Sequence, residues 1–182
     1  MNADALLAFV RFHAWANDWI LTVAAGLSHD ELHAAGKLDH GSAFQTLRHL
    51  MDVDWSWRQF CIGNNVGDTY VWDQGFVLDD VPAIHAFCIE EDKRLRSYME
   101  SLDEAAVSES LAITPGHVVP RWLILAHVVN HGTQHRSELA RYLTECGHPI
   151  PRFKRPSPSA CSSDRGASPR DLWLRRRASP MV

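Results

Sequence analysis

The sequence predicts an all-α fold: a four-helix bundle with a short irregular, hairpin-like connection before the last helix. Four long segments carry apolar side chains at the spacing of an amphipathic helix, and stretches rich in Gly, Pro, Asn and Asp separate them. The connections are modest in length, and no internal repeat is present. Long amphipathic helices joined in this way are typical of a bundle, whose core can hold metal ligands from facing helices.

The first helix is expected from about Asp4 to Ala25, with Gly26 at its end. At about 100° per residue, its apolar residues fall on one stripe, which is typical of a core-facing side. His13 and Asn17 lie inside this stripe, so we expect them either to line a pocket or to form a buried hydrogen-bonded pair. The stripe consists of Leu6, Phe9, Val10, His13, Ala14, Asn17, Ile20, Leu21 and Ala24.

The second helix is expected from Ser42, a candidate N-cap, to about Cys61. His49 shares one face of this helix with mainly apolar residues, where a histidine must hydrogen-bond or bind a ligand to offset its desolvation. A second apolar face consists of Phe44, Met51 and Trp55. This face has no obvious place in a bundle core, so we expect it to form a helix–helix contact in a homodimer.

The third helix is expected to begin at Asp79 or Asp80 and to end near Leu102. Pro82 falls in its first turn, where a missing backbone N–H costs nothing. Residues 107–119 contain a Thr-Pro-Gly sequence, which is typical of a turn. We therefore expect a short irregular or hairpin segment between the third helix and the last one.

The last helix is expected from Pro120 to Gly147, and three histidines lie on it one turn apart. Two imidazoles separated by one turn, about 6 Å along the axis, can bind one cation, as in other helical histidine pairs. His127 and His135 are about 12 Å apart along the axis, so one adjacent pair is the candidate. We expect His131 and His135 to be that pair, because they share a face with core residues, whereas His127 lies further round.

His49 is the expected third ligand, because it lies on a core-facing stripe of a neighbouring helix. The alternative is that each histidine is a hydrogen-bonded core residue without a metal. Glu138 follows three residues after His135, where it could orient a ligand imidazole or act as a catalytic general base. The alternative for Glu138 is a solvated surface carboxylate.

The chain of 182 residues has 18 Lys and Arg side chains against 22 Asp and Glu, a net charge of −4. Residues 1–150 hold 10 basic and 20 acidic side chains, whereas residues 151–182 hold 8 and 2. The acidic part argues against a nucleic-acid-binding face, which needs clustered Lys and Arg. We expect a bundle domain over residues 1–151 and, over residues 152–182, a basic tail rich in Arg, Ser and Pro that is disordered.

The sequence predicts neither export nor a membrane partner. Polar residues interrupt the apolar N-terminus too early for a secretory signal, and no uncharged run approaches the ~20 residues of a membrane span. The cysteines are scattered without CxxC spacing, which favours a reducing, cytoplasmic location and argues against a thiolate metal site. They are Cys61, Cys88, Cys146 and Cys161.

Three stretches are similar to those of a known family. They are Trp15-Ala16-Asn17, Thr46-Leu47-Arg48-His49-Leu50 followed by Asp54 and Trp57, and the histidine-rich run from Leu125 to Glu138. These residues resemble the DinB family of bacterial four-helix bundles, also described as DinB/YfiT-like metalloenzymes. The resemblance covers about residues 4–152, and the histidine run is its most specific part.

Carried over position by position, the resemblance places the family's metal-binding histidines on His49, His131 and His135. Three imidazoles would suit Zn or Ni, with Fe or Mn as further candidates, and three protein ligands leave coordination positions open, as in catalytic sites. The resemblance implies an enzyme that acts on a small molecule, either a transferase that uses a low-molecular-weight thiol or a hydrolase. The alternative is a non-catalytic, stress-associated homodimer with a structural metal.

From Arg152 onward the family pattern fails. Relatives usually continue into a short acidic or aromatic segment that packs on the bundle, whereas this chain continues with Arg, Ser and Pro. A functional basic tail that binds nucleic acid or an acidic partner is one explanation. A change of reading frame near residue 152 is the favoured explanation, because GC-rich codons read out of frame often encode Arg, Pro and Ser.

Overall fold

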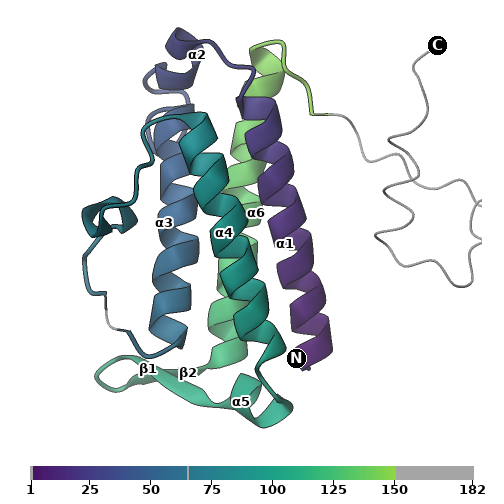
Figure 1. The fold of residues 1–182 in the computed structure, drawn as a ribbon, viewed down its shortest axis with the longest axis vertical. Helices are drawn as coiled ribbons and strands as arrows, with labels where there is room; N and C mark the ends of the chain where they lie inside the picture. The colour runs from purple at the N-terminus through teal and green to yellow at the C-terminus, as the bar shows by residue number, and fades with distance from the viewer. Residues whose placement is uncertain (1, 65, 151–182) are drawn as a thin grey trace, which may run out of the picture. The chain divides into compact units, whose positions relative to one another are not determined.

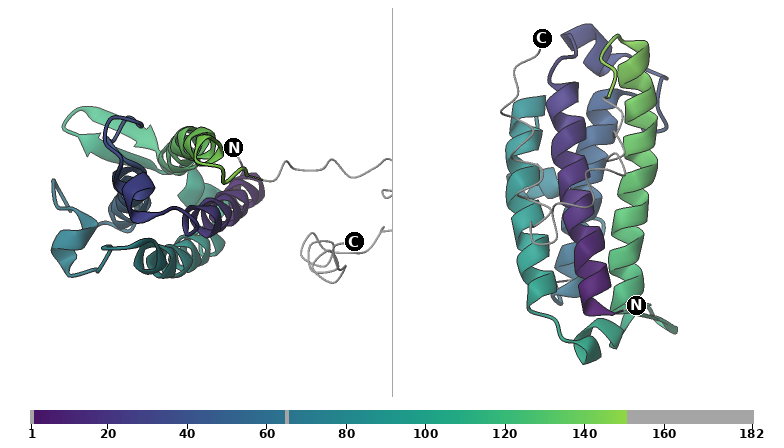
Figure 2. Two further views of the ribbon diagram at one scale, coloured as in Figure 1. Left: turned by 90° about the horizontal axis from the view of Figure 1, so that it is seen from above. Right: turned by 90° about the vertical axis from the view of Figure 1, so that its right-hand side faces the viewer.

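Four long helices lie side by side and form a bundle, as perpendicular views show (Figures 1 and 2). They are α1 (Ala3–Ala24), α3 (Ala43–Cys61), α4 (Val81–Glu100) and α6 (Arg121–Glu145). Both α1 and α3 pack against α4 and against α6, so α1 and α3 lie diagonally opposite each other. The computed structural model describes residues 2–64 and 66–150, and over these ranges it confirms the predicted all-α bundle.

Side chains cap the first turns of three of these helices. Asn2 accepts a hydrogen bond from the backbone N–H of Ala5, and Asp80 caps α4 in the same way. Ser42, the predicted N-cap of α3, accepts from the N–H of Gln45 at 3.2 Å. The observed boundaries lie within two residues of those expected, because these caps and the glycines near the helix ends are local signals.

The connections contain smaller elements, of which only the hairpin was predicted. Strands β1 (Ser110–Thr114) and β2 (His117–Pro120) pair antiparallel across a turn in which Gly116 adopts a positive φ of 79°. Sequence periodicity did not predict the short helices, since one turn of helix is too short to show it. They are α2 (His29–His33), the 3-10 helix η1 (Val71–Gln74) and α5 (Glu104–Ser108).

The second apolar face of α3 is internal, so the expectation of a homodimer contact on this face is wrong. Phe44, Met51 and Trp55 are at most 8% exposed. They belong to one buried cluster with Val71 and Leu78, which lie in the connection between α3 and α4. This long connection folds over α3 and supplies the cover that a minimal four-helix arrangement lacks. A homodimer as such stays a prediction.

The core-facing stripe of α1 is confirmed with one clear exception. Leu6, Val10, Ile20 and the other predicted residues are buried or half-buried. Phe9 is 51% exposed, because it lies at the edge of the stripe, beside the surface that α1 shares with α6. A helical period identifies the centre of a buried stripe more reliably than its margins.

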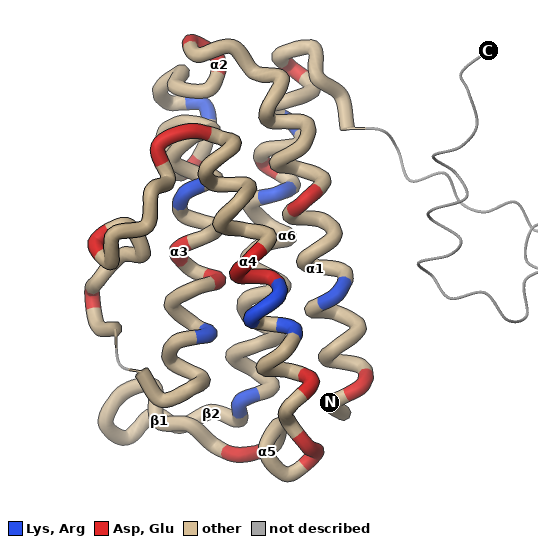
Figure 3. The backbone as a smooth tube through the Cα atoms, in the orientation of Figure 1, with Lys and Arg blue, Asp and Glu red and all other residues tan. Residues whose placement is uncertain are grey.

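Charged residues of both signs gather along the middle of α4 (Figure 3), where residues 90–94 read Glu-Glu-Asp-Lys-Arg. Glu91 is only 2% exposed and accepts hydrogen bonds from Nε and Nη2 of Arg58 on α3. This bidentate ion pair ties α3 to α4, and Arg94 supplies a second positive charge at 3.4 Å.

None of the helices in the described ranges combines the length and the apolar character that a membrane span requires. The predicted tail, residues 152–182, lies outside the described residues. Its expected disorder therefore stays a prediction, as does the domain boundary at residue 151.

Candidate metal centre

Two helices supply the three histidines that were predicted as ligands. His49 on α3 faces His131 on α6, and their Nε2 atoms are 3.0 Å apart. His135 lies one turn further along α6, with its ring centroid 4.5 Å from that of His131 and 5.1 Å from that of His49. The structure therefore brings all three imidazoles close together, and their binding of a metal stays a prediction.

A fourth imidazole, His40, lies in the same cluster and was not predicted. Its ring stacks on that of His49 with centroids 3.7 Å apart, and it lies 4.9 Å from the ring of His135. The possible ligand atoms of His40, His49 and His135 all lie within 4.8 Å of one another, so these three residues could hold a metal ion. His40 precedes α3 in a turn, where helical periodicity carries no signal.

The environment of the cluster favours the neutral form of His40, His49 and His131. Burial, reinforced by the neighbouring histidines, lowers the pKa of His49 to about 4 and that of His131 to about 4. Burial and the nearby His135 also lower the pKa of His40. A neutral imidazole retains the lone pair that binds a cation, so these shifts favour ligation at neutral pH.

Glu138 contacts the cluster from α6, at the position the sequence indicated. Its Oε2 atom is 3.1 Å from Nδ1 of His135 and accepts a hydrogen bond from the protonated Nδ1. This contact favours the tautomer in which Nε2 of His135 carries the lone pair that can bind a cation. A carboxylate that fixes the tautomer of a histidine ligand in this way is common around protein-bound metals.

The donor set fits a divalent transition metal. His131 Nδ1 is buried without a hydrogen-bond partner among the described residues, and its Nε2 approaches His49 Nε2. Two facing ring nitrogens in a half-buried site need a proton or a cation between them. Imidazole donors suit Zn, Ni, Cu and Fe better than Mg or Ca, which prefer oxygen.

The sequence model of the DinB family matches residues 1–162, most of the chain. The protein belongs to the DinB family. The match extends ten residues beyond the position at which the family pattern was expected to fail. A comparison with curated proteins gives no significant match.

In this DinB-family protein a buried polar network lies directly beside the histidine cluster. Asp54 accepts hydrogen bonds from His13 Nε2 at 2.8 Å and from Asn17 Nδ2 at 3.1 Å. Arg136 donates through Nη1 to Asn17 Oδ1 at 2.6 Å and to His13 Nδ1 at 3.1 Å. Of the two alternatives for His13 and Asn17, the structure therefore shows the buried hydrogen-bonded one.

The network joins α1, α3 and α6, and its charges are those of Arg136 and Asp54. Asp92 on α4 lies close to it, and burial together with the charge of Asp54 raises the pKa of Asp92 to about 6. The possible ligand atoms of His13, Asp54 and Asp92 also lie within 4.8 Å of one another. Since Arg136 already supplies the positive charge and His13 is fully hydrogen-bonded, this second group is a structural network.

Gly132 makes the close approach between α1 and α6 possible. A Cβ atom at this position would lie 2.5 Å from Cε1 of His13 and 2.5 Å from Nη1 of Arg136. Only a glycine leaves room for the His13 ring against the backbone of α6. Gly132 and Arg136 each follow one of the predicted ligands, His131 and His135, in the sequence.

Asp52 and His127 lie near the candidate ligands in the sequence and have other roles or positions. Asp52 Oδ1 accepts a hydrogen bond from the backbone N–H of Val71 at 2.8 Å, so it anchors the connection that covers α3. His127 is exposed and lies outside the cluster, with its ring centroid 5.8 Å from that of His131.

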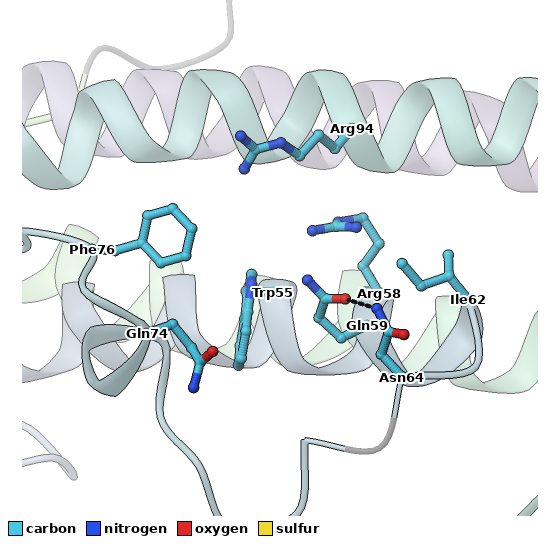
Figure 4. Close-up of a pocket in the computed structure, with 8 residues that line it drawn as sticks. All are labelled: Trp55, Arg58, Gln59, Ile62, Asn64, Gln74, Phe76 and Arg94. Carbon is cyan, nitrogen blue, oxygen red and sulfur yellow. Dashed lines mark hydrogen bonds between the residues drawn. The ribbon is translucent and has the colours of Figure 1, made fainter.

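A pocket of about 500 Å³ lies between α3, α4 and the connection that joins them (Figure 4). Arg58, which lines it, is nine residues after His49, which places the two on opposite sides of α3. Its lining offers amide, guanidinium and aromatic groups and no residue of a metal-binding type. The lining residues are Trp55, Arg58, Gln59, Ile62, Asn64, Gln74, Phe76 and Arg94.

Proposed function

We propose that the protein is a metal-dependent enzyme that acts on a small molecule by thiol transfer or by hydrolysis. One observation carries this proposal: four imidazoles from α3, α6 and the turn before α3 meet in a half-buried cluster, where Glu138 orients His135. A structural role alone does not require four clustered imidazoles with so few hydrogen-bond partners.

His49, His131 and His135 would hold the metal, with Zn or Ni as the first candidates and Fe or Mn next. When bound, such an ion supplies Lewis acidity, which lowers the pKa of a coordinated water or thiol. The protein contributes fixed ligands on two packed helices. Glu138 holds the proton on Nδ1 of His135 at 3.1 Å and so keeps the other ring nitrogen available.

The buried cysteines cannot supply the nucleophile. Burial raises the pKa of Cys61 to about 11 and, together with Asp92, raises that of Cys88 well above its usual value. Both are therefore protonated thiols at neutral pH, and neither belongs to the histidine cluster. Thiol chemistry at this site would need a low-molecular-weight thiol as co-substrate, and hydrolysis would need water.

The free thiols of Cys61, Cys88 and Cys146 also support a cytoplasmic location.

Aromatic side chains beside the cluster offer a contact surface for a small molecule. The half-buried Trp57 on α3 lies edge-on to His127 of α6, with ring centroids 5.6 Å apart, and His127 in turn neighbours His131. An apolar or aromatic group of the substrate could pack against this surface while its reacting atom faces the histidines.

Metal analysis tests the proposal together with an activity screen. We expect the purified protein to hold about one divalent ion per chain and the double variant His49→Ala/His135→Ala to hold none. The matched control is His29→Ala/His117→Ala, which removes two exposed histidines outside the cluster. The metal-loaded protein should transfer a small thiol to an electrophile or hydrolyse an ester or amide, and the double variant should not.

Two outcomes would contradict the proposal in different ways. If the protein stays free of metal after incubation with Zn, Ni, Mn and Fe, the metal centre itself is refuted. If it binds one ion tightly, but shows no exchangeable coordination position and no activity over the substrate panel, the alternative of a structural metal in a non-catalytic protein is favoured.

A further inference from the structure

His40 lies in a turn that the chain itself fixes. The backbone N–H of Gly41 donates to the carbonyl of Leu38 at 2.8 Å, and the N–H of Lys37 donates to the carbonyl of Gly41 at 3.3 Å. Gly41 adopts a φ of 90°, which favours glycine, and Leu38 is buried in the core. His40 therefore occupies a defined place at the start of α3.

The same turn is attached to the helix that carries the other ligands. Arg141 of α6 donates through Nη2 to the carbonyl of Lys37 at 3.4 Å, and Ser42 at the end of the turn caps α3. The turn thus bridges α3 and α6 close to the cluster. Its position relative to His49 and His135 is set by both helices.

The ring of His40 lies on the solvent side of the cluster. It is exposed, whereas His49 is half-buried and His135 is buried. It stacks on His49 at an interplanar angle of 24° and meets His135 edge-on at 65°. A small rotation of an exposed ring would turn its nitrogen toward the nitrogens of the other two, which already lie within 4.8 Å of it.

We propose that His40 is a displaceable fourth ligand that closes the metal centre on its solvent side. This inference rests on the proposed metal-dependent function. The three helical imidazoles are held by packing, whereas His40 is exposed on a surface turn, so it is the ligand that an incoming group can replace. A small thiol, which binds transition metals as a soft thiolate, has the chemistry to displace an imidazole there.

Titration with Co²⁺, whose visible absorption reports its coordination, tests this proposal. The proteins are the wild type, His40→Ala and the control His29→Ala, which removes another exposed imidazole. We expect His40→Ala to bind Co²⁺ at least about tenfold more weakly, with weaker visible bands, and His29→Ala to match the wild type. Added 2-mercaptoethanol should produce a sulfur-to-cobalt absorption band at a lower thiol concentration in His40→Ala than in the wild type.

The proposal is overturned if His40→Ala binds Co²⁺ with the affinity and spectrum of the wild type. It is also overturned if 2-mercaptoethanol binds to both proteins at the same concentration. A wild-type protein that takes up no Co²⁺ refutes the metal-dependent function instead, and with it this inference. Because His40 is exposed, far-ultraviolet circular dichroism should show the same helical content in all three proteins.

Discussion

Replacing Gly132 with Ala tests whether the fit between α1 and α6 is as tight as the structure indicates. The added methyl group would lie 2.5 Å from Cε1 of His13 and from Nη1 of Arg136, about 1 Å inside normal contact. The His13 ring cannot retreat easily, because it is fully buried and its Nε2 lies 2.8 Å from Asp54 Oδ2. Either His13 or Arg136 must therefore give up hydrogen bonds.

The expected cost of Gly132→Ala follows from three terms. Overpacking of a close-packed interior costs about 1–3 kcal/mol. Leaving a buried hydrogen-bonding group of Arg136 or His13 without its partner adds about 1–3 kcal/mol. The better helix propensity of Ala returns about 1 kcal/mol. We therefore expect the free energy of unfolding of the metal-free protein to fall by about 1–5 kcal/mol.

Urea unfolding followed by circular dichroism measures this loss, and a double-mutant cycle with His13→Ala identifies its cause. Removing the ring of His13 makes room for the methyl group, so Gly132→Ala should cost less in that background by about 1–3 kcal/mol. If Gly132→Ala is as stable as the wild type, α1 and α6 have more room than the structure shows. If the two changes are simply additive, contact with His13 is not the cause.

Two further predictions concern carboxyl groups. Glu138→Gln should weaken metal affinity by 10–100-fold, because the carboxylate that orients His135 is lost. Metal titration would measure this change. Unchanged affinity with lost activity would instead make Glu138 the general base. In the folded state Asp92 has a pKa of about 6, above the usual aspartate value of 3.8. Between these two pH values the folded protein therefore holds a proton that the unfolded chain has released. The stability of the wild type should therefore fall by up to about 3 kcal/mol as the pH rises from about 4 to above 6, whereas Asp92→Asn should escape this loss. Urea unfolding at about pH 5 and about pH 7.5 checks this, and a stability difference between the two proteins that is the same at both values would contradict it.

The fold was predictable to the extent that it depends on local signals. Helix periodicity and caps such as Ser42 and Asp80 located the four long helices within two residues. The short helix α2 was missed, although the capping box of Ser28 and Glu31 marks its start. The wrong homodimer face had a different cause, since the cover over Trp55 comes from the irregular connection before α4, which no periodicity reveals.

The histidine cluster was predictable where its residues lie on helices. A spacing of four residues places His131 and His135 on one face of a helix regardless of tertiary structure. The apolar residues around His49 indicated that its side chain faces the core, where the other two histidines lie. His40 was missed, because its position depends on a turn closed by Leu38 and Gly41. The role of His13 was left open, since its choice between pocket and hydrogen bond is decided by Asp54 and Arg136, which are distant in sequence.

Residues of the buried polar network and of the histidine cluster alternate along α6. This arrangement explains why a costly buried network lies beside the histidines. Gly132 and Arg136 form one stripe of α6 that faces α1, and His131 and His135 form the adjacent stripe that faces α3. The charge of Arg136 is opposed by that of Asp54, five residues after His49 on α3. His13 and Asn17 on α1 link Arg136 to Asp54 through hydrogen bonds, and displacing either charged group would leave it buried without these partners. The network therefore fixes the rotation and height of α6 relative to α3, and it does so at the two turns that carry the predicted ligands.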